Sequence, residues 1–274
     1  MKRRQFLRGA LSLGAGGLLP GVALTASDWI LPEPAVEPLM PIWDAATGGH
    51  WDIVKEWLRL EPSLINFRGG VTVGKDRWEQ LTLLHIAATW DSDAKVLQYL
   101  VSQFKSVDIN AKDGNLATPL HLATIFGAVK VLQYLVSQGA DVNAKDKYDG
   151  TPLFWAAFYN KDVEGIKFLV SAGANIHVKD HAGRTPLHSA AENTTSVEIL
   201  QYIISQGVDV NAVSNCYLTP LHFAARKNSN LEIVRYLISV GADVNAKSRS
   251  GCPPLYFANT EEKECILREA MAEK

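Results

Sequence analysis

The chain has 274 residues, of which 47% are hydrophobic and 20% are charged, and its formal net charge is −2 at pH 7. This composition supplies enough apolar material for a packed core, and it argues against a disordered chain and against a broad surface that binds nucleic acid. The three cysteines, Cys216, Cys252 and Cys265, all lie in the last quarter. Their odd number and their spacing fit neither a zinc site nor a disulfide framework, so we expect free thiols.

The first 26 residues differ from the rest of the chain. A basic start is followed by an uncharged, glycine-rich stretch over residues 9–26. This order is typical of a secretory signal peptide, and the small residues at its end predict cleavage near Ala26. A pair of arginines shortly before Phe-Leu resembles the twin-arginine signal, which directs folded proteins out of the bacterial cytoplasm into the periplasm. The residues that carry this resemblance are Arg3, Arg4, Phe6 and Leu7.

An alternative for residues 1–26 is an uncleaved membrane anchor, because 18 uncharged residues lie at the short limit for spanning a bilayer. Five glycines and Pro20 weaken such a helix, so we expect cleavage. Cleavage removes four positive charges and takes the formal net charge from −2 to −6. Residues 27–39 contain three prolines and show no hydrophobic periodicity, which predicts a short extended linker.

From residue 40 onward the chain repeats itself. The tetrapeptide Thr-Pro-Leu-His, or a close variant of it, recurs with successive starts 36, 33, 34, 34 and 34 residues apart. These copies begin at Thr82, Thr118, Thr151, Thr185, Thr219 and Pro253. A degenerate copy begins near Met40, which makes seven units, the outer two atypical.

Each unit predicts two helices and a connecting turn. Threonine is a good N-cap, and the proline that follows it suits the first turn of a helix. A second helix follows with apolar residues three and four apart, as in Leu231–Ile238, and stops at a glycine suited to the left-handed conformation, such as Gly241. The segment Ala-Asp-Val-Asn-Ala at residues 242–246 then starts an extended turn toward the next unit.

The Thr-Pro-Leu-His start, the paired alanines and the Gly-Ala-Asp-Val-Asn-Ala end resemble the ankyrin repeat family over residues 40–274, about 85% of the chain. The resemblance implies an all-α repeat solenoid, in which paired antiparallel helices stack and β-hairpin loops project between units. A unit of this kind buries its apolar face only against its neighbours, so the stability comes from the interfaces between units. The charged residues after residue 260 are expected to solvate the last unit as a cap.

One departure from the pattern lies between the first two units. Their starts are 42 residues apart against about 33 for a standard repeat, and the surplus falls within Phe67–Gln80. Residues 69–76 nearly match a phosphate-binding P-loop, but Asp76 stands where a serine or threonine would hold magnesium. We therefore expect a flexible surface loop. The alternative is a periplasmic enzyme, or a nucleotide- or metal-binding protein, that uses residues 67–80.

Other candidates for chemistry are weak. One histidine recurs at the same place in four units: His85, His121, His188 and His222. The family resemblance implies that this histidine is structural and bonds to the backbone near the hairpin. His177 and His181 flank Asp180 but are too few to make a convincing metal site. No GxSxG, HExxH or CxxC motif occurs, so we predict no enzyme, no cofactor and no bound metal.

Two stripes of side chains are candidates for contacts. In ankyrin proteins the two residues after the paired alanines tend to face the concave groove. Here the groove residues are aromatic in three successive units and charged beyond them: Trp90, Ile125, Phe126, Phe158, Tyr159, Glu192, Asn193, Arg226 and Lys227. An exposed aromatic patch beside polar residues is typical of a partner site, and rings packed on one another are the alternative.

The second stripe occupies one recurring position of the second helix: Tyr99, Tyr134, Phe168, Tyr202 and Tyr236. This regular spacing favours a ladder of rings that stabilises neighbouring units.

These patterns predict a non-catalytic protein-interaction module in the bacterial periplasm. We expect it to be monomeric alone and to bind a protein partner through its concave groove and hairpin tips, with no nucleic acid and, after signal cleavage, no membrane. A narrower alternative is an inhibitor or immunity protein for a toxin or an envelope enzyme, because the acidic mature surface permits a basic partner.

Overall fold

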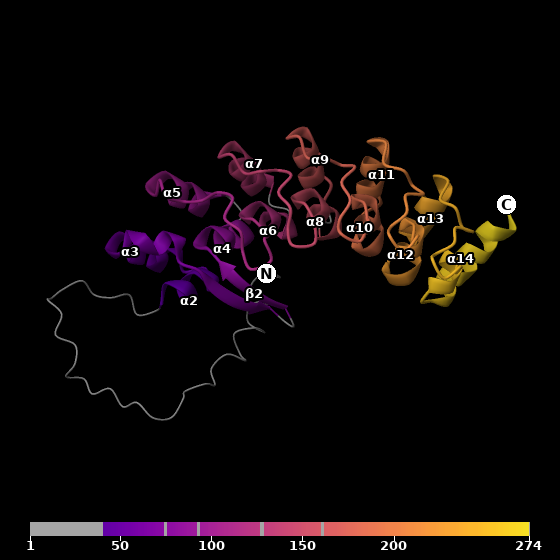
Figure 1. The fold of residues 1–274 in the computed structure, drawn as a ribbon, viewed down its shortest axis with the longest axis horizontal. Helices are drawn as coiled ribbons and strands as arrows, with labels where there is room; N and C mark the ends of the chain where they lie inside the picture. Colours follow the sequence, from indigo (N-terminus) through magenta and orange to yellow (C-terminus); the bar gives the residue numbers. More distant parts are fainter. Residues whose placement is uncertain (1–40, 74–75, 92–93, 127–128, 160–161, 274) are drawn as a thin grey trace, which may run out of the picture.

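The structure is a computed structural model that describes residues 41–273 apart from 74–75, 92–93, 127–128 and 160–161. The predicted signal peptide, its residues Arg3, Arg4, Phe6 and Leu7, and the linker over 27–39 lie outside the described residues. The described chain folds into a row of helix pairs (Figure 1). This confirms the predicted all-α solenoid of ankyrin-type units.

The first helices of the pairs are α2 (Ile42–Thr47), α4 (Leu83–Trp90), α6 (Pro119–Phe126), α8 (Pro152–Tyr159), α10 (Pro186–Asn193) and α12 (Pro220–Lys227). The second helices are α3 (Trp51–Leu60), α5 (Lys95–Gln103), α7 (Val129–Ser137), α9 (Glu164–Ser171), α11 (Val197–Ser205) and α13 (Leu231–Ser239). The last unit replaces its first helix with the 3-10 turn η2 (Pro254–Phe257), and α14 (Glu261–Ala272) follows. The row bends so that the second helices form its outer layer and the first helices its inner layer (Figure 1).

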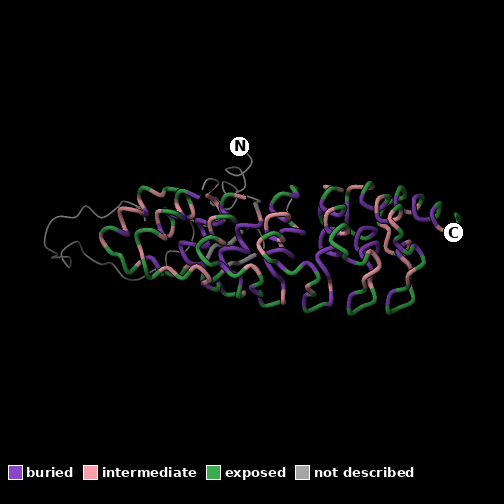
Figure 2. Tube along the Cα trace, turned by 90° about the horizontal axis from the view of Figure 1, so that it is seen from above, coloured by how far each residue is buried: buried purple, intermediate pink, exposed green. Residues whose placement is uncertain are grey.

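One hydrophobic core runs through the units. The leucine of each Thr-Pro-Leu start, as at Leu153 and Leu187, is fully buried between the helix layers. The paired alanines are equally buried, as at Ala190 and Ala191, and their small size lets each first helix lie close to the next. Buried backbone follows the long axis of the row, and exposed backbone concentrates at the turns (Figure 2). Most stabilising contacts therefore join neighbouring units.

The described part of the insertion after the first unit forms a β-hairpin, where the sequence predicted a flexible surface loop. After the 3-10 turn η1 (Pro62–Asn66), strand β1 (Gly69–Val73) pairs antiparallel with β2 (Asp76–Leu81). A β-branched Val-Thr-Val run favours an extended chain, which explains the first strand. Because a strand rather than a helix follows residues 74–75, the segment lacks the strand–loop–helix order of a P-loop.

The other connections, which we call finger turns, are tight turns over residues 113–118, 146–151, 180–185, 214–219 and 248–253. In the second of them, Asp146 Oδ1 accepts the N–H groups of Tyr148 at 2.7 Å and Gly150 at 2.8 Å. Equivalent side chains hold the other turns: Asp113, Asp180, Ser214 and Ser248. Because a side-chain oxygen takes the N–H groups that a strand ladder would need, these connections form turns instead of the expected β-hairpins.

The finger turns are tied to one another by backbone hydrogen bonds. Lys147 N–H donates to Asn115 O at 2.8 Å, and His181 N–H donates to Tyr148 O at 2.8 Å. The recurring asparagine adds a second bridge, since Asn143 Nδ2 donates to Gly173 O at 3.0 Å in the next unit. The turns therefore form a continuous edge along the row.

The C-terminal cap has the charged, exposed face that the sequence predicted, with Glu261, Glu262, Arg268 and Glu269 exposed, but one of its charged residues is buried. Lys263 of α14 is only 1% exposed, and its Nζ donates to Ala225 O at 3.0 Å and Asn259 Oδ1 at 2.6 Å. In the preceding unit Asn228 Nδ2 plays the same part by donating to Ala191 O at 2.9 Å. The lysine thus closes the end of α12 as an interior asparagine closes α10, and burial lowers its pKa.

Candidate functional site

The interfaces between first helices are built on the threonine and histidine of the repeated tetrapeptide. The N–H of Thr118 donates to His121 Nδ1 at 3.1 Å, and His121 Nε2 lies 3.2 Å from Gly150 O in the next finger turn. These two bonds require a neutral ring with its proton on Nε2. Equivalent bonds join His85 to Ala117 O, His188 to Leu218 O and His222 to Cys252 O.

Burial lowers the pKa of all four histidines. For His85, His121 and His188 the pKa falls to about 4, and for His222 it also lies below its ordinary value. The cause is the loss of hydration of the charged ring inside the core. The recurring histidine therefore acts as a neutral tie between units, as the family resemblance implied.

Three of the four ties are completed by a ring from the following unit, whereas Leu122 stands at the equivalent position beside His85. His188 meets Phe223 edge-on at 5.5 Å between centroids, and His222 meets Phe257 in the same way at 5.4 Å. His121 likewise meets Trp155 at 5.3 Å. An edge-on ring pair fills the space beside the helix and adds a favourable quadrupole contact.

The interface between α8 and α10 lacks this arrangement, because the residue that each helix contributes is different. Phe154 stands where the other units have histidine, so its side chain cannot donate to the carbonyl of the next finger turn. Ser189 stands where Trp155 and Phe223 supply their rings. The interface therefore lacks both the tie and the ring that completes it.

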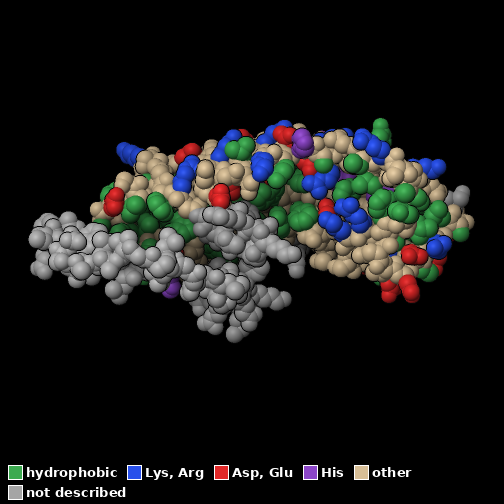
Figure 3. All heavy atoms as spheres, turned by 60° about the horizontal axis from the view of Figure 1, so that its bottom comes forward, with side chains coloured by type: hydrophobic (Ala, Val, Ile, Leu, Met, Phe, Trp, Pro, Cys, Tyr) green, Lys and Arg blue, Asp and Glu red, His purple; other side chains and the backbone are tan. Residues whose placement is uncertain are grey.

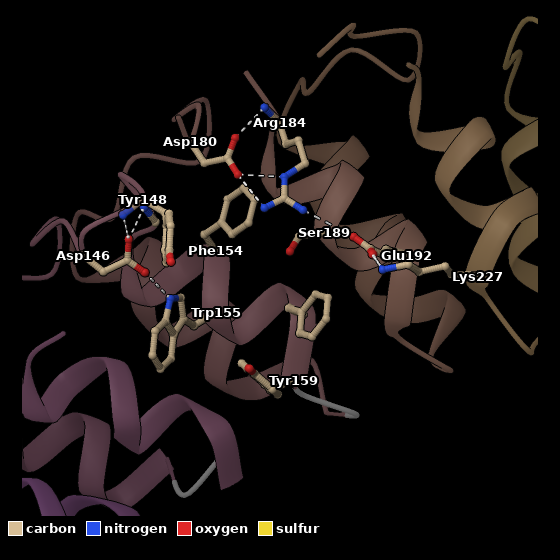
Figure 4. Close-up of a pocket in the computed structure, with 12 residues that line it drawn as sticks. Asp146, Tyr148, Phe154, Trp155, Tyr159, Asp180, Arg184, Ser189, Glu192 and Lys227 are labelled. Carbon is tan, nitrogen blue, oxygen red and sulfur yellow. Dashed lines mark hydrogen bonds and ion pairs between the residues drawn. The ribbon is translucent and has the colours of Figure 1, made fainter. Parts of the chain in front are cut away.

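A cavity of about 410 Å³ lies at this interface (Figure 4). Its aromatic lining comes from α8 and the finger turn before it: Tyr148, Phe154, Trp155, Phe158 and Tyr159. Its polar lining comes from two finger turns, from α10 and from α12: Asp146, Asp180, Arg184, Ser189, Glu192 and Lys227. The cavity opens to solvent, and its wall is mostly apolar with a few polar groups, a mixture that suits contact with a partner.

The polar lining is a chain of alternating charges. Arg184 Nε lies 2.7 Å from Asp180 Oδ2, and Arg184 Nη1 lies 3.5 Å from Glu192 Oε2. Lys227 Nζ then contacts Glu192 Oε1. The guanidinium of Arg184 also lies over the ring of Phe154, at 5.5 Å from its centroid. These contacts hold Arg184 at the edge of the cavity and neutralise the two buried carboxylates.

The aromatic lining is held in place by a hydrogen bond from the finger turn and by contacts between the rings. Trp155 Nε1 donates to Asp146 Oδ2 at 2.8 Å, which fixes the indole against the finger turn. Tyr159 packs edge-on against Phe158 at 4.9 Å, and its ring lies 6.0 Å from that of Trp155. The wall is therefore positioned before anything binds, which lowers the entropy cost of binding.

Ser189 carries the unusual polar atom of the cavity. Its side chain is fully buried, and its Oγ has no hydrogen-bond partner among the described residues. Leaving a buried hydroxyl unpaired costs about 1–3 kcal/mol. Because its accessible surface is close to zero, this hydroxyl lies behind the wall of the cavity and not in its open space.

Four of the groove residues predicted from the sequence line this cavity. Phe158 and Tyr159 belong to its aromatic wall, and Tyr159 is 42% exposed. Glu192 and Lys227 belong to its charged wall, but Glu192 is only 5% exposed and both its oxygens face cations. Glu192 therefore positions its neighbours more than it offers a free charge.

The other predicted groove residues lie elsewhere. Trp90 and Ile125 are half-buried and pack against the core. Asn193 Nδ2 donates to Phe158 O at 2.9 Å, and Arg226 lies over the ring of Phe223 at 5.4 Å. Phe126 ends α6, and its side chain lies outside the described part of the structure.

The sequence patterns did not single out several residues of the cavity, including Tyr148, Trp155, Arg184 and Ser189. The available signal was the double departure from the chain's own repeat, with Phe154 replacing histidine and Ser189 replacing a large apolar residue one unit later. Each of these two residues is ordinary in a helix, so neither predicts a cavity alone. The cavity depends on the two positions lying opposite each other across one interface.

The remaining candidate residues, in the second stripe and in the turn with His177 and His181, lie outside the cavity. The second stripe, from Tyr99 to Tyr236, is half-buried against the core, and a ladder of rings between units stays a prediction. Asp180, between His177 and His181, is bound to Arg184, and no group of three metal-ligating side chains occurs within the described ranges. The same ranges contain no helix that is both long enough and apolar enough to cross a bilayer.

Comparison with known proteins places this geometry in a family. A family model described as ankyrin repeats, in three copies, matches residues 42–146, 144–214 and 188–268. The chain is 37% identical over 62 residues to the serine/threonine-protein kinase VIK of Arabidopsis thaliana. The matched segment covers 23% of this chain and 14% of the kinase. It is 28% identical over 120 residues to the transient receptor potential cation channel subfamily A member 1 of Drosophila melanogaster, which covers 43% of this chain and 9% of the channel.

A shorter relative is the ankyrin repeat-containing protein P1E11.10 of Schizosaccharomyces pombe. It is 39% identical over 69 residues, which covers 25% of this chain and 32% of the yeast protein. The chain thus spans a third or less of the length of each of these relatives, and the likeness concerns the repeats.

Proposed function

The chain belongs to the ankyrin repeat family, and from that premise we propose that it binds a protein partner at the cavity between α8 and α10 and along the adjoining finger turns. Ankyrin repeats form protein-interaction modules. The observation that carries the proposal is the preformed cavity in the inner layer of helices. Its wall is aromatic, and Tyr159 in that wall is partly exposed. Hydrophobic side chains beside Lys and Arg gather on the face toward which the first helices lie (Figure 3). Such a mixture is typical of partner surfaces.

The finger turns supply a second line of support. Leu116 and Tyr217 have φ angles of 61° and 58°, in the left-handed region, and their side chains are 46% and 55% exposed. The equivalent positions in two other finger turns are Gly183 and Gly251. A non-glycine residue in this region costs roughly 1–2 kcal/mol. Bulky side chains held exposed against that cost favour contact with a partner over a role in stability.

Site-specific photo-crosslinking in cells tests the proposed surface. Replacing Tyr159 by a benzoyl-phenylalanine should give a discrete protein adduct, because position 159 is exposed at the edge of the cavity. The matched control is the same replacement at Gln201, which is exposed on α11 in the outer helix layer. Equal adducts at both positions, or adducts at neither, would contradict the proposal.

We also propose that the protein acts in the bacterial periplasm, exported in folded form and cleaved near Ala26. The basis is the arginine pair and the uncharged stretch after it. Changing Arg3 and Arg4 together to lysine should leave uncleaved precursor in the cytoplasm. Continued export of that variant would point to the route for unfolded chains instead. The exported chain should then elute as a monomer on size-exclusion chromatography with light scattering.

A further inference from the structure

We propose that the cavity between α8 and α10 binds an arginine side chain of the protein partner, with its guanidinium beside Asp146 and against the aromatic wall. This inference rests on the proposed function and specifies the chemistry of the partner at one point. It starts from a buried carboxylate of the cavity wall, that of Asp146, which has no ion pair within the described ranges.

The charges of the cavity wall do not cancel. The wall contains the three carboxylates of Asp146, Asp180 and Glu192 and the two cations of Arg184 and Lys227. Both cations are paired with Asp180 or Glu192. Three negative and two positive groups leave a formal charge of −1, and the excess lies at Asp146. A cation that enters the cavity therefore meets a carboxylate without a counter-charge, and the net charge of −2 on the whole chain acts in the same direction.

The next finger turn shows what Asp146 lacks. Arg184 comes four residues after Asp180, donates from Nε to its Oδ2 at 2.7 Å, and lies over a ring of α8 at 5.5 Å from the centroid. In the finger turn of Asp146 the corresponding residue is Gly150. Trp155 Nε1 donates to Asp146 Oδ2 at 2.8 Å in place of an arginine, but it brings no charge. A guanidinium of the partner would supply the charge that the chain itself supplies one unit later.

The carboxylate of Asp146 has an unused acceptor position. A carboxylate offers about four such positions. Oδ1 accepts the N–H groups of Tyr148 and Gly150, and Oδ2 accepts from Trp155, which leaves one position on Oδ2. A Cβ at Gly150 would lie 2.8 Å from Oδ2, so the glycine keeps a side chain away from that oxygen. One N–H of a guanidinium can therefore bond to Asp146 while the bonds that hold the turn stay in place.

The rings of the same cavity suit a guanidinium. Trp155 and Phe158 are half-buried, and Tyr159 is 42% exposed. The indole of Trp155 lies beside Asp146, on the opposite side of the cavity from Lys227 (Figure 4). A planar guanidinium stacks on ring faces and is more weakly hydrated than an ammonium, so this combination of rings and one carboxylate favours arginine over lysine.

Lys147 belongs to the same finger turn but does not supply the missing counter-charge. It is exposed and is not part of the cavity wall. Its Nζ lies over the ring of Tyr148 at 5.3 Å from the centroid and 3.5 Å from Asn115 Oδ1. Because a cation already lies over Tyr148, we assign the guanidinium of the partner to the rings of Trp155 and Tyr159.

Titration of the full-length protein with blocked tripeptides tests this inference. The probes are acetyl-Gly-Arg-Gly-amide and its counterparts with citrulline, lysine and phenylalanine, of which citrulline has the shape of arginine without the charge. Binding is followed by the NMR signals of the Trp155 indole N–H and the Gly150 amide, which both donate to Asp146. We expect the arginine peptide to bind with a dissociation constant on the order of 1 mM, the lysine peptide about threefold more weakly, and the other two at least tenfold more weakly.

Three variants locate the binding. Asp146→Asn removes the charge but keeps an oxygen for the finger turn, and it should weaken binding of the arginine peptide at least tenfold. The matched control is Asp149→Asn, which removes a carboxylate of the same turn that pairs with Lys145 outside the cavity wall, and it should change binding less than threefold. Tyr159→Leu removes a ring without touching the turn and should weaken binding at least threefold, so it tests the site even where Asp146→Asn does not fold.

Other results would overturn the inference. Equal binding of the arginine and citrulline peptides would show that the charge plays no part. Equal or tighter binding of the lysine or phenylalanine peptide would identify a different occupant. Absence of binding by the arginine peptide up to tens of millimolar, or unchanged binding to a folded Asp146→Asn protein, would remove the site. A Tyr159 crosslink that persists in those cases would leave the proposed function standing without this inference.

Discussion

The interface between α10 and α12 and the interface between α8 and α10 use the same helix positions but fill them with different side chains. At the first, His188 donates to Leu218 O at 3.0 Å and meets the ring of Phe223. At the second, Phe154 and Ser189 replace that pair and a cavity of about 410 Å³ remains. The difference shows that the same two positions can close one repeat interface with a histidine tie and leave a cavity beside the next, which is the site that we propose for the partner.

The open interface is stabilised by other means. Arg184 bridges Asp180 and Glu192 while covering Phe154, and Lys227 reaches back to Glu192 from the next unit. These ion pairs are part of the cavity wall. The charged network therefore joins α10 to the finger turn before it and to α12.

The largest expected effect on the free energy of unfolding is that of acid, which weakens the interfaces tied by histidine. The pKa of His85, His121 and His188 is about 4 in the folded chain and about 6.5 in the unfolded chain, so only the unfolded chain takes up protons in between. The contribution of each histidine is complete above pH 6.5 and is lost as the pH falls toward 4, by about 3 kcal/mol.

Urea unfolding between pH 7 and pH 4 measures this loss. The unfolding midpoint should fall steeply across that window, and the loss due to these histidines should level off below pH 4. A midpoint that stays constant from pH 6.5 to 4.5 would show that the ties are not buried as described. The interface at Phe154 adds no such proton uptake, because phenylalanine does not titrate.

Exchanging the two side chains tests the comparison directly. His188→Phe removes the donor to Leu218 O and the acceptor for the Thr185 N–H, which should cost about 3 kcal/mol. Phe154→His offers a new donor to the carbonyl of Arg184 but loses the cation contact on the ring, so its effect should stay within about 1 kcal/mol. The free energy of unfolding in urea at pH 7 measures both, and equal losses would contradict the asymmetry.

The finger turns beside these two interfaces give the smallest effect. Tyr217→Gly relieves a left-handed residue and should raise the free energy of unfolding by about 1 kcal/mol. Gly183→Ala should lower it, because φ is +73° and the added Cβ would lie 2.4 Å from Asn215 Oδ1. Thermal unfolding at pH 7 measures both shifts. A destabilised Tyr217→Gly variant would show that the tyrosine serves the fold rather than a partner.

The sequence predicted the fold because the repeat is local. Threonine caps, buried leucines, paired alanines and asparagine bridges recur in each unit, so one unit describes the next. The candidate groove was predicted in part, and Phe158, Tyr159, Glu192 and Lys227 do line one cavity. That Glu192 is buried could not be read from its own unit, because Arg184 comes from a finger turn and Lys227 from the following helix.

The cavity itself was not predicted, for a related physical reason. Phe154 and Ser189 lie 35 residues apart, and each is an acceptable residue for a helix. Only the packing of α8 against α10 turns the two departures into a shared space. The insertion was expected to be a loop because its surplus residues lie between two repeat units, whereas backbone pairing of β1 with β2 makes a hairpin.

The most direct test of the central claim measures two properties of one variant, Ser189→Phe. We predict that the added ring displaces Arg184 from Phe154 and reshapes the cavity wall, while cooperative urea unfolding is retained. The same variant should reduce the protein adduct formed through a benzoyl-phenylalanine at position 159 at least tenfold. A stable Ser189→Phe protein that crosslinks as strongly as the wild type would contradict the claim that the open interface is the binding site.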